Sequence, residues 1–231
     1  MEKIDYMFIG VHPDDIEIGC GGTVKKLSKK YNVMMVDLTE GEMGSNGNRK
    51  IRLDESKKAA EILDAIYRIN LGLADTNLKD DDHTIFMIAD IIRKYRPENI
   101  VYPYEKDYHP DHEYGSKLIR KVIFKSGLIK YKTDYEKYRP IRSYCYYIND
   151  IEKPTFFVDI SDEYEFKIKA LKSHESQFLT KNCSNKTYLN SGFIDKIMAR
   201  DRYFGSSLGC EYAEPLYYDK EILVDSLDFM K

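Results

Sequence analysis

The sequence has no tryptophan, only four cysteines among 231 residues, and no long hydrophobic run. A membrane-spanning helix needs about 20 consecutive apolar residues, and no stretch of this chain approaches that length. The cysteines show neither CxxC spacing nor the density of a small secreted scaffold, so we expect free thiols in a reducing compartment. The first residues lack the basic segment and the cleavage site of a secretory signal, and we therefore expect a cytoplasmic protein.

An excess of one charge sign is also absent. The 36 basic and 39 acidic residues are interspersed and give a net charge of −3. A nucleic-acid-binding protein presents a basic patch or stripe, which this pattern excludes. We find neither internal repeats nor low-complexity linkers. The length and the apolar content of 42% fit one domain, residues 1–231, with a sizeable core.

Short apolar runs alternate with helical patterns from the N-terminus to Gly127. The predicted strands are Ile4–Gly10, Val33–Leu38, Ala65–Leu71 and Asn99–Tyr102. The predicted helices are Ile16–Lys30, Arg49–Asp64, His83–Tyr95 and Glu113–Phe124. This alternation is typical of βαβ units, so we expect an α/β fold with a Rossmann-like, mostly parallel twisted sheet and helices on both faces. The first turn does not match GxGxxG, which excludes dinucleotide binding on that motif.

The pattern changes after Gly127. The remaining predicted elements are two strands around an Asn149–Asp150 turn, two helices and a polar loop: Ser143–Ile148, Thr155–Ile160, Ser161–Ser173, Gly192–Tyr203 and Thr180–Asn190.

Two clusters of histidine and aspartate follow predicted strands. His12-Pro13-Asp14-Asp15 comes after the first strand, and His109-Pro110-Asp111-His112 comes after the fourth. In open α/β folds the ligand crevice lies outside the carboxyl ends of the strands. Imidazole nitrogens and carboxylate oxygens bind zinc, and three such ligands with one open position make a catalytic site. A turn stiffened by proline would explain one such cluster without a metal. Two clusters of the same kind predict a metal site.

The adjacent carboxylates Asp14 and Asp15 suggest two different tasks, because neighbouring ionised carboxylates repel each other. If Asp15 binds the metal, Asp14 can point toward the metal's open position and accept a proton from water. The alternative is that Asp14 caps the following helix.

These clusters and other segments resemble the PIG-L/LmbE-like metal-dependent N-deacetylases. The further similar segments are Glu17–Thr23, Thr39–Gly44, Arg52 with Glu55, Leu71–Asp75, Ser176–Gln177 and Tyr212–Pro215. Within the family, Ser126–Leu128, Lys153–Pro154 and Val158–Ser161 look most like the bacillithiol-pathway branch, which deacetylates N-acetylglucosaminyl malate. The resemblance implies hydrolysis of the acetamide of such a small glycoconjugate, with release of acetate. Another N-acetylated glycoconjugate is the alternative substrate.

The resemblance also implies a ligand set and an assembly. His12, Asp15 and His112 would bind one Zn²⁺ per chain, with Fe²⁺ as the alternative metal. Related proteins often assemble as trimers or hexamers, so the resemblance implies a homo-oligomer.

The remaining roles follow from the same resemblance. Asp14 would be the general base, and His109 would stabilise the oxyanion or protonate the leaving amine. Asp111 would orient one imidazole as a carboxylate behind it. Arg52 would contact the substrate through its guanidinium. The alternative for Arg52 is a pair with Glu55 on a helix surface.

One position departs from the family pattern, because Tyr108 stands where relatives often carry arginine. A non-catalytic metal- or sugar-binding module would keep the ligands and lose the base, so Asp14 and His109 together favour an enzyme. His83 and His174 lie outside both clusters, and we expect both on the surface.

Overall fold

The computed structural model describes residues 3–179, 181 and 183–223 of the chain. The strands are β1 (Tyr6–Gly10), β2 (Val33–Thr39), β3 (Tyr67–Leu73), β4 (Asn99–Pro103), β5 (Arg142–Tyr146), β6 (Phe156–Asp159) and β7 (Ala213–Tyr217). The helices are α1 (Asp15–Ser28), α2 (Arg49–Ile62), α3 (Asp82–Tyr95), α4 (Pro110–Ser126), α5 (Tyr164–Ser173), α6 (Glu175–Phe178) and α7 (Phe193–Leu208). None of the described helices is long and apolar enough to cross a membrane.

The described strands form one seven-stranded sheet in the order β3-β2-β1-β4-β5-β7-β6. β1 to β5 are parallel, and β7 runs antiparallel to both of its neighbours. The predicted α/β class with a mostly parallel sheet is therefore confirmed. The chain moves outward from β1 to β3 and then crosses back to β4 on the other side of β1. This reversal is a topological switch point, where α/β folds bind their ligands beyond the carboxyl ends of the strands.

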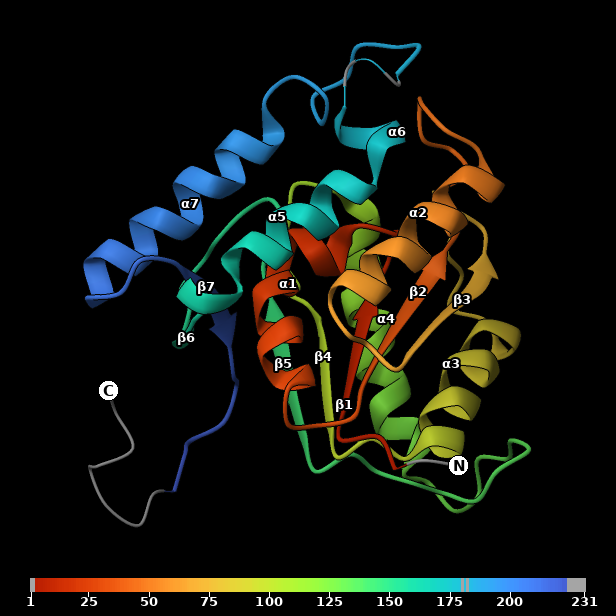
Figure 1. Ribbon diagram of the computed structural model, residues 1–231. Coiled ribbons are helices and arrows are strands. Elements are labelled where there is room, and N and C mark those ends of the chain that lie inside the picture. The colour runs from red at the N-terminus through yellow and green to blue at the C-terminus, as the bar shows by residue number, and fades with distance from the viewer. Residues whose placement is uncertain (1–2, 180, 182, 224–231) are drawn as a thin grey trace.

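Helices cover both faces of the sheet (Figure 1). α1, α2 and α5 pack together on one face, and α3 packs against α4 on the other. β1 illustrates the reason, because Phe8 belongs to the core under α1 while Met7 and Ile9 belong to the core under α3 and α4. A strand buried on both faces reads as a continuous apolar run, which is how this strand was predicted.

The two strands predicted around Asn149–Asp150 are present as β5 and β6, but they are not neighbours in the sheet. β7 lies between β5 and β6 and separates them. β7 itself was not predicted, because Pro215 lies within it and proline cannot donate a hydrogen bond to a strand ladder. The strand is held through Glu214, whose carboxylate accepts from the backbone N–H groups of Gly22 (2.9 Å) and Thr23 (2.7 Å) in α1.

Helix α4 begins at Pro110, three residues before the predicted start. Proline suits the first position of a helix because its missing N–H would have no partner there. His109 caps this helix, with its Nδ1 accepting from the backbone N–H of Asp111 at 3.2 Å. Asp111 and His112 therefore lie in the first helical turn rather than in a loop, which fixes the directions of their side chains.

Two smaller predictions concern loops and thiols. Of the predicted loop Thr180–Asn190, residues 180 and 182 lie outside the described residues. The four cysteines all lie in the described part of the chain, and no disulfide joins any two of them.

Candidate active site

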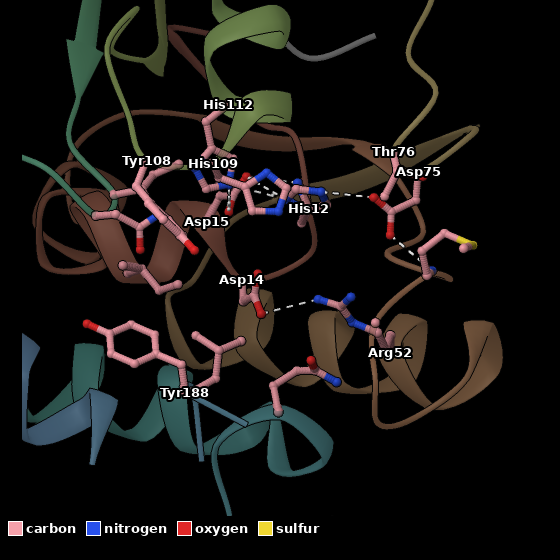
Figure 2. Close-up of a pocket in the computed structure, with 17 residues that line it drawn as sticks. His12, Asp14, Asp15, Arg52, Asp75, Thr76, Tyr108, His109, His112 and Tyr188 are labelled. Atoms are coloured by element: carbon pink, nitrogen blue, oxygen red, sulfur yellow. Dashed lines mark hydrogen bonds and ion pairs between the residues drawn. The ribbon is translucent and has the colours of Figure 1, made fainter. Parts of the chain in front are cut away.

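A pocket of about 260 Å³ opens beyond the carboxyl ends of β1 and β4 (Figure 2). Six of the seven residues predicted to form the site line it, and they come from three parts of the chain that are far apart in sequence. These residues are His12, Asp14, Asp15, Arg52, His109 and His112. The seventh, Asp111, is not among the lining residues, and its Oδ2 lies 3.5 Å from His12 Nε2.

The three predicted metal ligands converge. His12 Nδ1 lies 3.2 Å from His112 Nε2, and His112 Nε2 lies 3.1 Å from Asp15 Oδ1. His12 Nδ1 and Asp15 Oδ2 are 3.7 Å apart. All three side chains are buried, and their ligand atoms lie within 4.8 Å of one another.

Carboxylates behind the two imidazoles decide which ring nitrogens carry hydrogen. His12 Nε2 lies 3.0 Å from Asp75 Oδ1, and His112 Nδ1 lies 2.8 Å from Asp107 Oδ1. Because an ionised carboxylate only accepts hydrogen bonds, this network assigns the ring hydrogens to these outer nitrogens. The inner nitrogens, His12 Nδ1 and His112 Nε2, are then the atoms that bind either a proton or a metal ion. Two such nitrogens that converge with a carboxylate oxygen of Asp15 fit a cation at their centre.

The charges of the cluster lead to the same conclusion. Asp15 Oδ2 accepts from the backbone N–H groups of Val11 (2.9 Å) and His12 (2.8 Å), which leaves Oδ1 facing His112. Burial alone would raise the pKa of Asp15, but His112 and His12 hold it well below its usual range. Burial alone would lower the pKa of His112, but Asp15 and Asp107 raise it to about 9. These carboxylates favour positive charge at this point.

A second group, His12, His109 and Asp111, also brings possible ligand atoms together. His109 and Asp111 are only partly buried, and His12 Nε2 lies closer to Asp75 (3.0 Å) than to Asp111 (3.5 Å). The first group fits a metal better, because each of its imidazoles keeps a carboxylate behind it. Asp111, which was predicted to orient one imidazole, lies 3.5 Å from His12 Nε2, and Asp75 is the nearer partner at 3.0 Å.

One carboxylate oxygen of Asp14 points toward Arg52 (Figure 2). Arg52 Nη2 lies 3.2 Å from Asp14 Oδ2, and Arg52 Nη1 donates to the carbonyl oxygen of Gly41 at 2.8 Å. Gly41 has a φ of +64°, and a Cβ there would collide with the guanidinium. Burial raises the pKa of Asp14, and the Arg52 charge offsets part of that rise.

The structure shows neither of the alternative roles, Asp14 as a helix cap or Arg52 as the partner of Glu55. The Asp14 side chain makes no capping hydrogen bond to α1. Glu55 does not pair with Arg52, because its carboxylate accepts from the backbone N–H and the hydroxyl of Ser176, each at 2.7 Å. Arg52 is instead 4% exposed at the edge of the pocket.

His109 packs its ring on both histidines of the cluster. The ring centroids lie 4.7 Å from His112 and 4.9 Å from His12. Burial lowers the pKa of His109, and the two neighbouring imidazoles lower it further. Because its Nδ1 accepts from the backbone N–H of Asp111, the hydrogen of the neutral ring lies on Nε2.

Sequence reasoning assigned no role to Asp75 or Asp107, although Asp75 follows β3 and Asp107 follows β4. Their positions shortly after strand ends were the sequence signal that could have indicated a role in the site. His174 was predicted on the surface, which is wrong: it is fully buried, with Nε2 3.2 Å from Glu17 Oε1, because the corner between α5 and α6 packs over α1. His83 is exposed as predicted.

Comparison with known proteins identifies relatives of the whole chain. Residues 7–123 match the PIG-L family, described as GlcNAc-PI de-N-acetylase. A diacetylchitobiose deacetylase from Thermococcus kodakarensis is 35% identical, and the match covers 72% of this chain and 67% of that protein. The solved structure of a conserved protein from Thermus thermophilus is 32% identical, with a TM-score of 0.89 over 99% of both chains. The N,N'-diacetylchitobiose deacetylase from Pyrococcus horikoshii is 26% identical, with a TM-score of 0.82 over 94% of this chain and 84% of that one. The chain therefore belongs to the PIG-L family of de-N-acetylases.

Proposed function

We propose that this protein is a zinc-dependent enzyme that hydrolyses the acetamide of an N-acetylglucosamine conjugate and releases acetate and the free amine. The observation that carries the proposal is the convergence of three metal-ligand atoms from His12, Asp15 and His112, beside the buried carboxylate of Asp14. The similarity to proteins named diacetylchitobiose deacetylase supports an N-acetylated sugar as the substrate class.

The donor set of two imidazoles and one carboxylate suits zinc, and ferrous iron accepts the same ligands. A bound zinc supplies Lewis acidity, lowering the pKa of a coordinated water toward ~7 and polarising the carbonyl. Asp75 and Asp107 hold the two imidazoles with His12 Nδ1 and His112 Nε2 directed inward. These two aspartates therefore orient the ligand atoms before the ion binds.

Asp14 is the proposed general base. Its pKa is raised by burial, which makes the carboxylate a better proton acceptor than an exposed aspartate. Asp14 takes a proton from the attacking water as the oxygen–carbon bond forms. It then delivers this proton to the nitrogen as the carbon–nitrogen bond breaks, so that acetate and amine leave. The ion pair with Arg52 holds the carboxylate in place during both transfers.

His109 is the proposed donor to the oxyanion. Its lowered pKa favours the neutral ring, and the backbone N–H of Asp111 leaves the ring hydrogen on Nε2. A neutral N–H aimed at the developing negative charge stabilises the transition state without a proton transfer. Protonation of the leaving amine by His109, the other role that the resemblance implied, would require a doubly protonated ring and the loss of the hydrogen bond from Asp111.

Finer properties stay predictions from the sequence. These are N-acetylglucosaminyl malate as the substrate, a homotrimer or homohexamer, and a cytoplasmic location.

The test is acetate release by protein stripped with a chelator. We expect no release from N-acetylglucosamine conjugates by the stripped enzyme, and recovery after one equivalent of zinc or ferrous iron is added. Unchanged activity of fully stripped protein would contradict the metal-dependent mechanism. Metal binding without acetate release from any conjugate would instead favour a binding module.

A further inference from the structure

A second hollow lies between helix α4 and strand β5, outside the candidate active site. It consists of two adjoining parts of about 250 Å³ and 170 Å³, and Arg120 and Ser143 line both of them. We call the two parts together the α4–β5 groove. Along α4 the groove extends from Ser116 to Phe124, which is about 12 Å of helix. Among the described residues, the groove and the active-site pocket share no lining residue.

The smaller part of the groove is cationic. No described carboxylate lines it, whereas four cationic side chains do: Arg120, Arg139, Arg142 and Lys220. Three of these cations, Arg139, Arg142 and Lys220, form no ion pair with any carboxylate of the described residues, and Arg120 lies 3.8 Å from Glu105. This concentration of positive charge contrasts with the net charge of −3 of the whole chain. Guanidinium groups bind phosphate oxygens in pairs, so the smaller part suits a phosphate group.

Arg139 is held in place at the smaller part. Its guanidinium packs on the ring of Phe124, with Cζ 5.1 Å from the centroid, and donates to the Phe124 carbonyl oxygen at 3.5 Å. Gly127 lies against the same guanidinium, and a Cβ there would collide with it. The φ of Gly127 is −82°, which any residue adopts. The missing side chain therefore serves to make room for Arg139.

The loop between α4 and β5 that carries Arg139 is fixed from inside the molecule. Arg93, in α3, is 2% exposed. It donates to three backbone carbonyl oxygens, each at 2.9 Å: those of Ser126, Leu128 and Tyr131. A binding surface that is held before the ligand arrives loses little entropy on binding.

The larger part of the groove suits hydroxyl groups and a ring. Ser116 is 2% exposed and lines this part, and its hydroxyl has no hydrogen-bond partner among the described residues. A buried polar group without a partner costs free energy, which a ligand hydroxyl would recover. Glu105 and Asp219 line the same part and can accept hydrogen bonds from hydroxyls. Tyr104 and Tyr217, with ring centroids 4.9 Å apart, add an aromatic surface.

We propose that the α4–β5 groove binds a phosphorylated sugar. The phosphate lies among Arg120, Arg139 and Arg142, and the sugar ring lies in the larger part, within reach of Ser116 and the tyrosines. Glu105 would repel a phosphate in the larger part, which sets the direction of the ligand. The groove would bind this ligand whether or not the protein is a deacetylase.

The experiment is calorimetric titration of the zinc-loaded protein, at constant ionic strength, with glucose 6-phosphate, glucose and inorganic phosphate. None of the three carries an acetamide, so none is a substrate of the proposed reaction. We expect glucose 6-phosphate to bind most tightly, inorganic phosphate to bind more weakly, and glucose to give no detectable binding.

Variants locate the binding. Arg142→Ala should weaken both phosphate-bearing probes by roughly 10-fold, the usual value of one hydrogen bond to a charged group. Gly127→Ala should weaken the same two probes, because it displaces the Arg139 guanidinium. Ser116→Ala should weaken glucose 6-phosphate by roughly 2–10-fold and leave inorganic phosphate unchanged, because the bare phosphate does not reach it.

The matched control is Lys130→Ala. Lys130 is an exposed cation on the same loop that does not line the groove, and its loss changes the net charge as Arg142→Ala does. Its variant should bind all probes like the unmutated protein.

Three results would overturn the inference. They are no detectable binding of glucose 6-phosphate, an affinity for it no higher than that for inorganic phosphate, and equal affinity in the unmutated and Arg142→Ala proteins. The last result would assign the phosphate to another place, such as the metal centre. Each of these results would leave the proposed deacetylase reaction standing.

Discussion

Asp14 and Arg52 form a buried ion pair, with 3.2 Å between Oδ2 and Nη2, although 38 residues separate them in sequence. The pair connects the loop after β1 with helix α2. It also separates two adjacent aspartates by function, because Asp15 points toward the histidines while Asp14 points toward Arg52. Arg52 therefore positions the proposed base.

Arg52→Lys should lower kcat more than it raises KM. Lysine cannot reproduce the planar fork that binds Asp14 and the Gly41 carbonyl together. Loss of a hydrogen bond to a charged group costs about 1.5–3 kcal/mol, which corresponds to roughly 10–100-fold in rate. Steady-state kinetics should give the same factor on every conjugate. A loss confined to the KM of the malate conjugate would instead assign Arg52 to a substrate carboxylate, one form of the substrate contact that the family resemblance implies.

Asp14→Asn should keep zinc and lose catalysis. The amide has the shape of the carboxylate but cannot accept a proton from water, so kcat should fall by roughly 10²–10⁴-fold. Zinc content and acetate release are measured on the same preparation. Loss of zinc together with activity would make Asp14 a ligand rather than the base.

Asp107→Asn should weaken zinc binding. Asp107 Oδ1 lies 2.8 Å from His112 Nδ1, and loss of such a carboxylate behind a metal-binding histidine typically costs roughly 10–100-fold in metal affinity. Competition with a chelator of known affinity measures the change. The control is Asp150→Asn, an exposed aspartate that does not line the pocket. Equal zinc affinity in the Asp107 and Asp150 variants would show that Asp107 does not orient His112.

Lys167→Met should destabilise the fold strongly. Lys167 Nζ lies 2.7 Å from both Asp201 Oδ2 and Glu214 Oε1, and all three side chains are fully buried. Removing the cation takes away the shared ion-pair partner of two buried carboxylates, of which Asp201 keeps its pair with Arg200 at 2.9 Å. Loss of one partner of a buried ion pair typically costs about 3–5 kcal/mol. Urea denaturation measures the free energy of unfolding.

The control for that variant is Lys169→Met. Lys169 lies on the same helix, in an exposed pair with Glu165 at 3.7 Å. Such a surface pair contributes about 1 kcal/mol or less. A similar loss of stability in both variants would contradict the role given to the buried cluster.

The first half of the fold could be predicted because its signals are local. Each strand from β1 to β4 is a short apolar run, and each following helix has its own periodic pattern. β7 could not be predicted in this way, because Pro215 disfavours a strand there and the groups that hold Glu214, in Gly22 and Thr23, lie about two hundred positions earlier in the sequence. Contacts between segments that are distant in sequence produce no recognisable pattern in either segment alone.

The residues of the site also divide into those with a local sequence signal and those brought together only by the fold. His12 with Asp15, and His109 with His112, could be found because each pair lies within four residues of sequence. Asp75 could not be assigned to His12, because the two meet only after β1 and β3 have taken their places in the sheet. The partner of Arg52 was missed for the same reason.

The zinc content of purified variants tests the metal centre most directly. We expect the unmutated protein to hold close to one zinc per chain, and His12→Ala, Asp15→Ala and His112→Ala to hold far less, because each removes one of three ligands. His83→Ala, which replaces an exposed histidine outside the pocket, should bind zinc like the unmutated protein. Full zinc occupancy in all three ligand variants would contradict the metal centre and the mechanism built on it.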